Sequence, residues 1–176
     1  RHFLPGFRRA LETGLLRMAL VAGVRPEVEA RFREEVRRAG VEPLLGGPLE
    51  ILCAPGFPEY YARFNALLAR TDVLWTKPSE LTFYGALGLP LVLAPPVGVH
   101  ERYNRRWARD SGAGMKQRDA RFASEWMTDW LADGMLAAAA WAGYMRLPKF
   151  GLYRILETVL AGPPERAACG PARAAG

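Results

Sequence analysis

Strand, helix and strand follow one another in DVLWTKPSELTFYGALGLPLVLA, residues 72–94, and this unit sets the class of the whole chain. Asp72–Trp75 and Pro90–Ala94 are short and mostly apolar, as is typical of strands buried on both faces. Between them, Pro78–Leu87 predicts a short helix, because proline suits the first helical turn and Gly88 follows as a stop signal. Such a unit predicts two parallel strands joined by a helical crossover.

The same alternation extends along the chain in both directions. Further strands are expected at Met18–Ala22, ended by Gly23, and at Leu49–Ala54. Further helices are expected from Pro26 to a stop at Gly40, at Pro58–Arg70 and at Val99–Arg109, with a glycine turn at Ser111–Gly114. C-terminal helices are expected at Ser124–Asp133, Met135–Met145 and Tyr153–Leu160. The predicted fold class is therefore α/β: a Rossmann-like parallel sheet with helices on both faces and a C-terminal helical segment.

Three segments divide the chain. Residues 18–161 are expected to form the Rossmann-like domain. Residues 1–17 mix basic and apolar side chains, and we expect a linker, a short helix or the remnant of a preceding domain there. Residues 162–176 are rich in glycine, proline and alanine, so we expect a disordered tail.

Composition limits the classes of function. Half of the 176 residues are hydrophobic and 24% are charged, which indicates about one folded domain. The net charge is +6 and 21 of the 24 basic residues are arginines, which favours anionic partners such as phosphates, nucleotides or lipid headgroups. Two cysteines and two histidines argue against a disulfide scaffold, a zinc fold or any other metal site, and we expect no cofactor. We expect a cytoplasmic protein, with peripheral contact to the inner membrane as a further hypothesis.

Ligands of an open parallel sheet bind beyond the carboxyl ends of its strands, and one loop there is the most informative. After the strand that ends at Trp75, a helix start offers free N–H groups to a phosphate, and Lys77 adds a positive charge. Ser79 offers a hydroxyl group, and Glu80 could accept two hydrogen bonds from a ribose diol. The alternative is structural: Pro78 begins the helix and Glu80 merely favours its positive end.

A second loop carries the only internal histidine. His100 lies at a predicted helix start that follows Gly98, and it shares a helix face with Asn104. Asn104 either holds the loop closed or binds a sugar hydroxyl. Glu101 either binds ligand or pairs with Arg105 on the helix surface.

A third loop follows the first strand. Gly23 either lets a ligand approach the backbone closely or is a turn glycine. Arg25 either neutralises a diphosphate or is solvated.

Several familiar signatures are absent. The first strand is not followed by G-x-G-x-x-G, which argues against a dinucleotide site. The chain contains neither G-x-x-x-x-G-K-[ST] nor G-x-S-x-G, and no D-x-D that would hold a divalent metal beside a diphosphate.

The segment from Asp72 to Pro96, followed by Gly98-Val-His-Glu-Arg-Tyr-Asn104, resembles the donor-binding half of a GT-B glycosyltransferase. The most similar group contains monogalactosyldiacylglycerol synthase and the enzyme that adds N-acetylglucosamine to the lipid-linked cell-wall precursor. In that group a strand ends in a TKPGG-x-T loop, and G-x-P, a strand, a proline and Q-E-x-x-N follow. Ser79 and Glu80 stand where the group has two glycines, and His100 stands where it has glutamine.

The resemblance implies metal-independent glycosyl transfer in a bacterial enzyme, with this chain binding a nucleotide-sugar donor, most simply a UDP-sugar. The loop residues that match, Thr76, Lys77, Glu101 and Asn104, would hold that donor. An N-terminal acceptor domain would be its partner, and the chain would not be active alone. No catalytic residue is assigned and no nucleic-acid partner is expected. The alternatives are a non-catalytic module of GT-B type that binds or scaffolds, and a sugar-nucleotide epimerase of the same fold.

Overall fold

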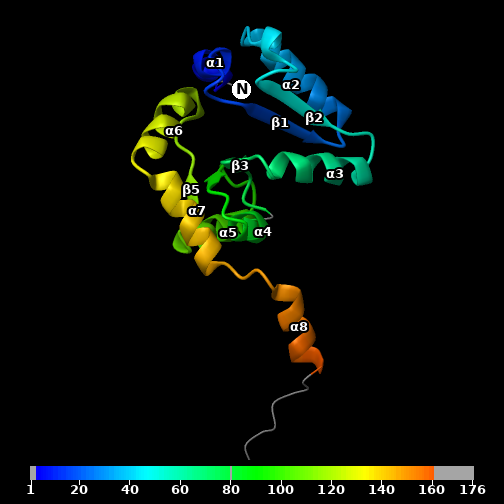
Figure 1. Cartoon of the computed structure of the whole chain (residues 1–176), viewed down its shortest axis with the longest axis vertical. Helices are drawn as coiled ribbons and strands as arrows, with labels where there is room; N and C mark the ends of the chain where they lie inside the picture. Colours follow the sequence, from blue (N-terminus) through cyan, green and yellow to red (C-terminus); the bar gives the residue numbers. More distant parts are fainter. Residues whose placement is uncertain (1–2, 80, 161–176) are drawn as a thin grey trace, which may run out of the picture.

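The computed structural model describes residues 3–79 and 81–160 (Figure 1). The helices are α1 (Leu4–Glu12), α2 (Pro26–Arg38), α3 (Phe57–Leu68), α4 (Leu81–Ala86), α5 (Val99–Asp110), α6 (Ala123–Ala132), α7 (Met135–Arg146) and α8 (Gly151–Leu160), with short 3-10 turns at Glu42–Leu44 and Ala120–Phe122. The strands are β1 (Met18–Gly23), β2 (Leu49–Cys53), β3 (Leu74–Thr76), β4 (Leu91–Leu93) and β5 (Gly114–Lys116).

All strand pairs in this part of the chain are parallel. β1 pairs with β2, with Met18 opposite Leu49, and β3, β4 and β5 pair in that order. The predicted α/β class, its parallel strands flanked by helices and its C-terminal helices are confirmed. The strands form two small sheets, of two and three strands, where we expected a single one.

The segment expected to be a glycine turn contains a strand. Gly112, with φ of +80°, makes the turn, and Gly114 begins β5. A Cβ on Gly114 would lie 3.0 Å from Leu93 Cδ1 and 3.2 Å from the carbonyl oxygen of Leu91. This glycine therefore serves close packing against β4, and the expectation of a turn at Gly114 is wrong.

Residues 4–12, within the segment expected to be a linker or a short helix, form α1. Leu4, Phe7 and Leu11 are buried, and Phe7 and Leu11 belong to the same cluster as Trp126 and Trp130 of α6. Helix α1 lies beside α6 in Figure 1 and contacts it. The helix thus belongs to the hydrophobic core. The tail expected to be disordered, residues 162–176, lies outside the described residues.

The C-terminal helices differ in how they pack. Helix α7 lies so close to α4 that a Cβ on Gly143 would be 2.5 Å from the carbonyl oxygen of Gly85. Helix α8 has no buried residue and extends away from the rest of the chain (Figure 1). Within the described ranges, no helix combines the length and the apolar character that crossing a bilayer requires.

Candidate functional site

Two of the candidate loops lie at the same edge of the three-stranded sheet. One runs from Thr76, at the end of β3, to Ser79, and the other connects the end of β4 to α5. Because β3 and β4 are parallel neighbours, their carboxyl ends meet, with Thr76 opposite Leu93. The N–H of Ala94 donates to the carbonyl oxygen of Thr76 at 2.9 Å and continues the pairing into the loops.

Asn104 joins the two loops. Its Nδ2 donates to the carbonyl oxygens of Pro78, at 3.1 Å, and of Ser79, at 3.4 Å. The Pro78 side chain beneath this contact is fully buried. Of the two roles considered for Asn104, the structure supports holding the Lys77 loop in place. The loops that carry Lys77 and His100 are therefore held side by side.

Glu101 holds the second loop through a hydrogen bond of its side chain. It is 8% exposed, and its Oε2 accepts a hydrogen bond from the N–H of Val97 at 2.7 Å. A glutamate in the first helical turn that reaches back to a preceding N–H satisfies a donor at the helix start. Of the two alternatives for Glu101, the surface pair with Arg105 is not formed, because the buried carboxylate binds the N–H of Val97 instead.

His100 and Lys77 remain available to a ligand. Both are exposed, and Lys77 has no ion pair with another described residue. The imidazole ring of His100 folds over Gly98, where an added Cβ would lie only 2.9 Å from His100 Cε1. Because Gly98 has no side chain, the His100 ring can pack against it at the start of α5. Ser79 is exposed in the same loop, and its N–H donates to the carbonyl oxygen of Lys77 at 2.8 Å.

Gly23 and Arg25 belong to the other sheet, where β1 ends. Gly23 has φ of +72°, which favours glycine, and its carbonyl oxygen accepts from the N–H of Ala54. Arg25 is exposed at the start of α2. In residues 3–79 and 81–160, no hydrogen bond or ion pair links either of them to the loops of Lys77 and His100. Glu80, the candidate for ribose binding, lies outside the described residues.

The sequence reasoning did not single out a polar cluster at the ends of β1 and β2. Burial, and then a hydrogen bond with Glu29, raises the pKa of the Cys53 thiol. The hydrogen bond from Arg33 lowers the pKa of Glu29. Arg63 donates to the Cys53 carbonyl oxygen at 2.8 Å. A raised pKa disfavours the thiolate, which is the nucleophilic form of cysteine.

Two grooves in the described residues lie away from Lys77 and His100. A groove of about 740 Å³ lies at the amino ends of β3 and β4, between α3, α4 and α7, and its walls are mostly apolar. A smaller one, of about 210 Å³, lies beside Arg118 and Trp126. Neither of these two grooves includes Lys77 or His100. Within the part of the chain that the structure describes, no three histidine, cysteine or acidic side chains gather as a metal site would require.

Comparisons with known proteins do not assign the chain to a group. No family model matches it, and neither a curated protein nor a solved structure is significantly similar to it. The resemblance of residues 72–104 to a glycosyltransferase therefore stays a hypothesis.

Proposed function

We propose that the edge formed by the Lys77 and His100 loops binds the diphosphate of a nucleotide-sugar donor. One observation carries the proposal: Asn104 holds together two loops that follow adjacent parallel strands, and each loop presents a cation or a hydrogen-bond donor to solvent. The edge beyond the carboxyl ends of parallel strands is where sheets of this class bind ligands.

The electrostatics of this edge suit a phosphate. Helix α5 begins at the edge, and its N-cap residue, Gly98, has no side chain to bond the first N–H groups, while the Glu101 carboxylate binds the N–H of Val97 just before them. Lys77 adds a full charge, and the His100 ring supplies a further donor over Gly98. A nucleoside diphosphate is the leaving group of glycosyl transfer, and such groups would stabilise its developing charge. Ser79 and Thr76 offer hydroxyl groups beside them.

The proposed reaction needs a second domain. Neither of the two described grooves encloses Lys77 or His100. A domain that carries the acceptor would cover the candidate edge, exclude water and supply the missing catalytic groups. We therefore propose a donor-binding half of a metal-independent glycosyltransferase, which binds donor without turning it over.

A second candidate is a binding or scaffolding module without catalysis. Two of the matched residues already bond to the protein itself: Glu101 to the N–H of Val97 in its own loop, and Asn104 to the carbonyl oxygen of Pro78 in the Lys77 loop. The larger groove is apolar and lies at the opposite end of β3 and β4. Both observations are compatible with a fold kept for its shape.

Thermal unfolding with a panel of nucleotides separates the two candidates. UDP, GDP, dTDP and ADP are added in turn, and we expect one of them to raise the unfolding temperature, since a ligand stabilises the state that it binds. The matching nucleoside monophosphate should have less effect, because the proposed contacts are made with the diphosphate.

Matched variants locate the binding. Lys77→Ala should weaken binding about tenfold, because removing a charged hydrogen bond costs about 1.5 kcal/mol or more. Lys149→Ala removes the same charge beside Tyr144, away from the edge, and should leave binding unchanged. No shift with any diphosphate would favour the scaffold, and equal losses in the two variants would mean that binding is not at this edge.

A further inference from the structure

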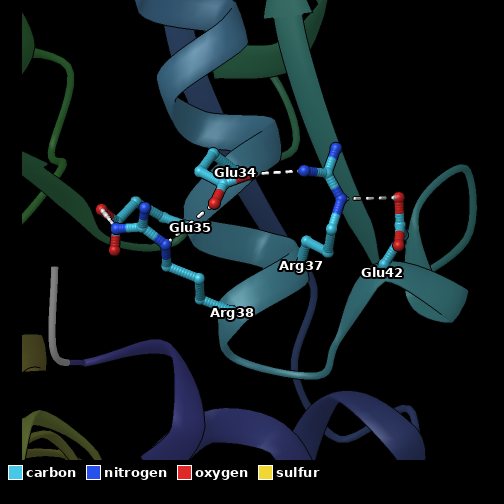
Figure 2. Close-up of polar contacts among 5 residues, drawn as sticks. All are labelled: Glu34, Glu35, Arg37, Arg38 and Glu42. Atoms are coloured by element: carbon cyan, nitrogen blue, oxygen red, sulfur yellow. Dashed lines mark hydrogen bonds and ion pairs between the residues drawn. The ribbon is translucent and has the colours of Figure 1, made fainter.

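Helix α2 shows how an exposed helix of this chain can cover its outer side. Arg37 pairs with Glu34 and with Glu42 (Figure 2). Arg38 pairs with Glu34 and with Glu35 beside them. The side of α2 that meets solvent is therefore polar, and its charges are neutralised within the helix and the turn that follows.

Helix α8 presents the opposite kind of surface. None of its ten residues, all of which the structure describes, is buried, and the helix extends away from the rest of the chain (Figure 1). At helical spacing, Arg154, Glu157 and Thr158 fall on one side. Six apolar side chains, between 47% and 82% exposed, fall on the other: Leu152, Tyr153, Ile155, Leu156, Val159 and Leu160. An apolar face of this size in solvent marks an interaction surface.

The groove of about 740 Å³ between α3, α4 and α7 offers a matching apolar surface. The buried side chains of Leu89 and Leu136 line it, together with Leu87 and Leu131, which are 54% and 69% exposed. An amphipathic helix binds in such a groove through residues at positions i, i+3, i+4 and i+7. The residues of α8 with this spacing are Leu152, Ile155, Leu156 and Val159.

The connection between α7 and α8 directs α8 away from the groove of its own copy. Leu147 is buried, and its φ of −83° and ψ of 140° are the extended backbone that a residue before proline favours. Pro148 has a fixed φ, and the Lys149 ammonium lies 3.2 Å from the centre of the Tyr144 ring. A short hinge that is held in this way leaves little freedom to turn α8 back, which favours the exchange of this helix between two copies.

We propose that the groove binds α8 of a second copy of this chain, and that two copies exchange these helices in a symmetric dimer. Each copy gives one helix and receives one, so the assembly closes with two identical contacts. The six apolar side chains of α8 and the fifteen described residues that line the groove match the roughly 20–30 residues per side of a stable interface. The proposal goes beyond donor binding and does not depend on it.

Sedimentation velocity over a range of protein concentrations tests this exchange. We expect a dimer that dissociates on dilution. Leu156→Asp on α8, or Leu131→Asp at the groove, would place a carboxylate in an apolar contact. Either change should raise the dissociation constant about tenfold for each contact, and so about a hundredfold for the two contacts of the dimer. Both side chains are exposed within a single copy, so neither change should unfold the chain.

A mixture of the two variants separates exchange from other modes of association. Each variant alone has a defect in both contacts, whereas a mixed pair joins the intact α8 of one copy to the intact groove of the other. The mixture should therefore form a dimer at a concentration where neither variant does so alone. Leu15→Asp is the matched control, because Leu15 is 87% exposed and does not line the groove, and it should leave the dimer unchanged. The urea unfolding curve of each variant checks that it is folded.

Three results would overturn the proposal. The first is a monomer at every concentration measured, which would mean that α8 stays in solvent or turns back onto its own copy. The second is a dimer that Leu156→Asp weakens and Leu131→Asp does not, which would mean that α8 pairs with α8. The third is a mixture that associates no better than its two components.

Discussion

Replacing Asn104 by alanine removes the contact that joins the two loops of the candidate site. Its bond to the Pro78 carbonyl oxygen, at 3.1 Å, has ordinary geometry, whereas the one to Ser79, at 3.4 Å, is long. One good neutral bond contributes about 1 kcal/mol net to stability. Alanine is the better helix former by about 0.6 kcal/mol, which offsets part of this loss. The measured decrease in unfolding free energy should therefore be about half a kcal/mol.

A matched asparagine separates the two effects. Asn65 is exposed on α3, and none of the described side-chain hydrogen bonds involves it. Asn65→Ala should therefore gain the helix-propensity term alone. In urea unfolding followed by circular dichroism, Asn104→Ala should be less stable than Asn65→Ala by about 1 kcal/mol, or about 2–4 °C in unfolding temperature. Equal shifts in the two variants would refute the role given to Asn104.

Three more predictions test other parts of the structure. Gly143→Ala should lower the free energy of unfolding by about 1–3 kcal/mol, because the new Cβ would lie 2.5 Å from a carbonyl oxygen of α4. Gly151→Ala, whose Cβ would meet no other atom, should leave stability unchanged. Calorimetry measures both variants. Glu101→Ala should cost about 1–3 kcal/mol in urea unfolding by leaving a loop N–H without its acceptor, and Glu101→Gln, which keeps an oxygen, should cost less. Because its pKa is raised, the Cys53 thiol should react slowly with iodoacetamide at mildly alkaline pH. Glu29→Gln should lower that pKa and speed the reaction, which is measured on the Cys53 peptide by mass spectrometry. An unchanged rate in Glu29→Gln would contradict this.

The strands and helices near the candidate site were largely predictable. Leu91–Leu93 is fully buried in the middle of its sheet, and such a strand appears in a sequence as an unbroken apolar run. The helix of Val99–Asp110 follows Gly98 and a strand, so its start was placed correctly. Local sequence patterns therefore predict an element where burial on both faces gives an apolar run, or where a capping residue marks its end.

What the sequence concealed depends on contacts between distant residues. Gly114–Lys116 is short and opens with a glycine that serves packing, so it resembles a turn. Whether Glu101 pairs on the surface or turns inward depends on the loop at Val97, and a helical spacing rule favours the surface. The bonds of Asn104 span 26 and 25 residues and leave no periodic signal. The division of the strands into two sheets is likewise a property of the whole fold.

The most direct test of the account follows the backbone amides of the isotope-labelled chain by NMR while UDP, GDP, dTDP and ADP are added in turn. The account predicts that the largest shifts fall on Lys77, on Ser79 and on the amides from Gly98 to Glu101, because these surround the proposed diphosphate position. At a ligand concentration near the dissociation constant of the unchanged protein, the same shifts should be much smaller in Lys77→Ala, which is expected to bind about tenfold more weakly. Shifts confined to the apolar groove around Leu89 and Pro90, or no shifts at all, would contradict the account.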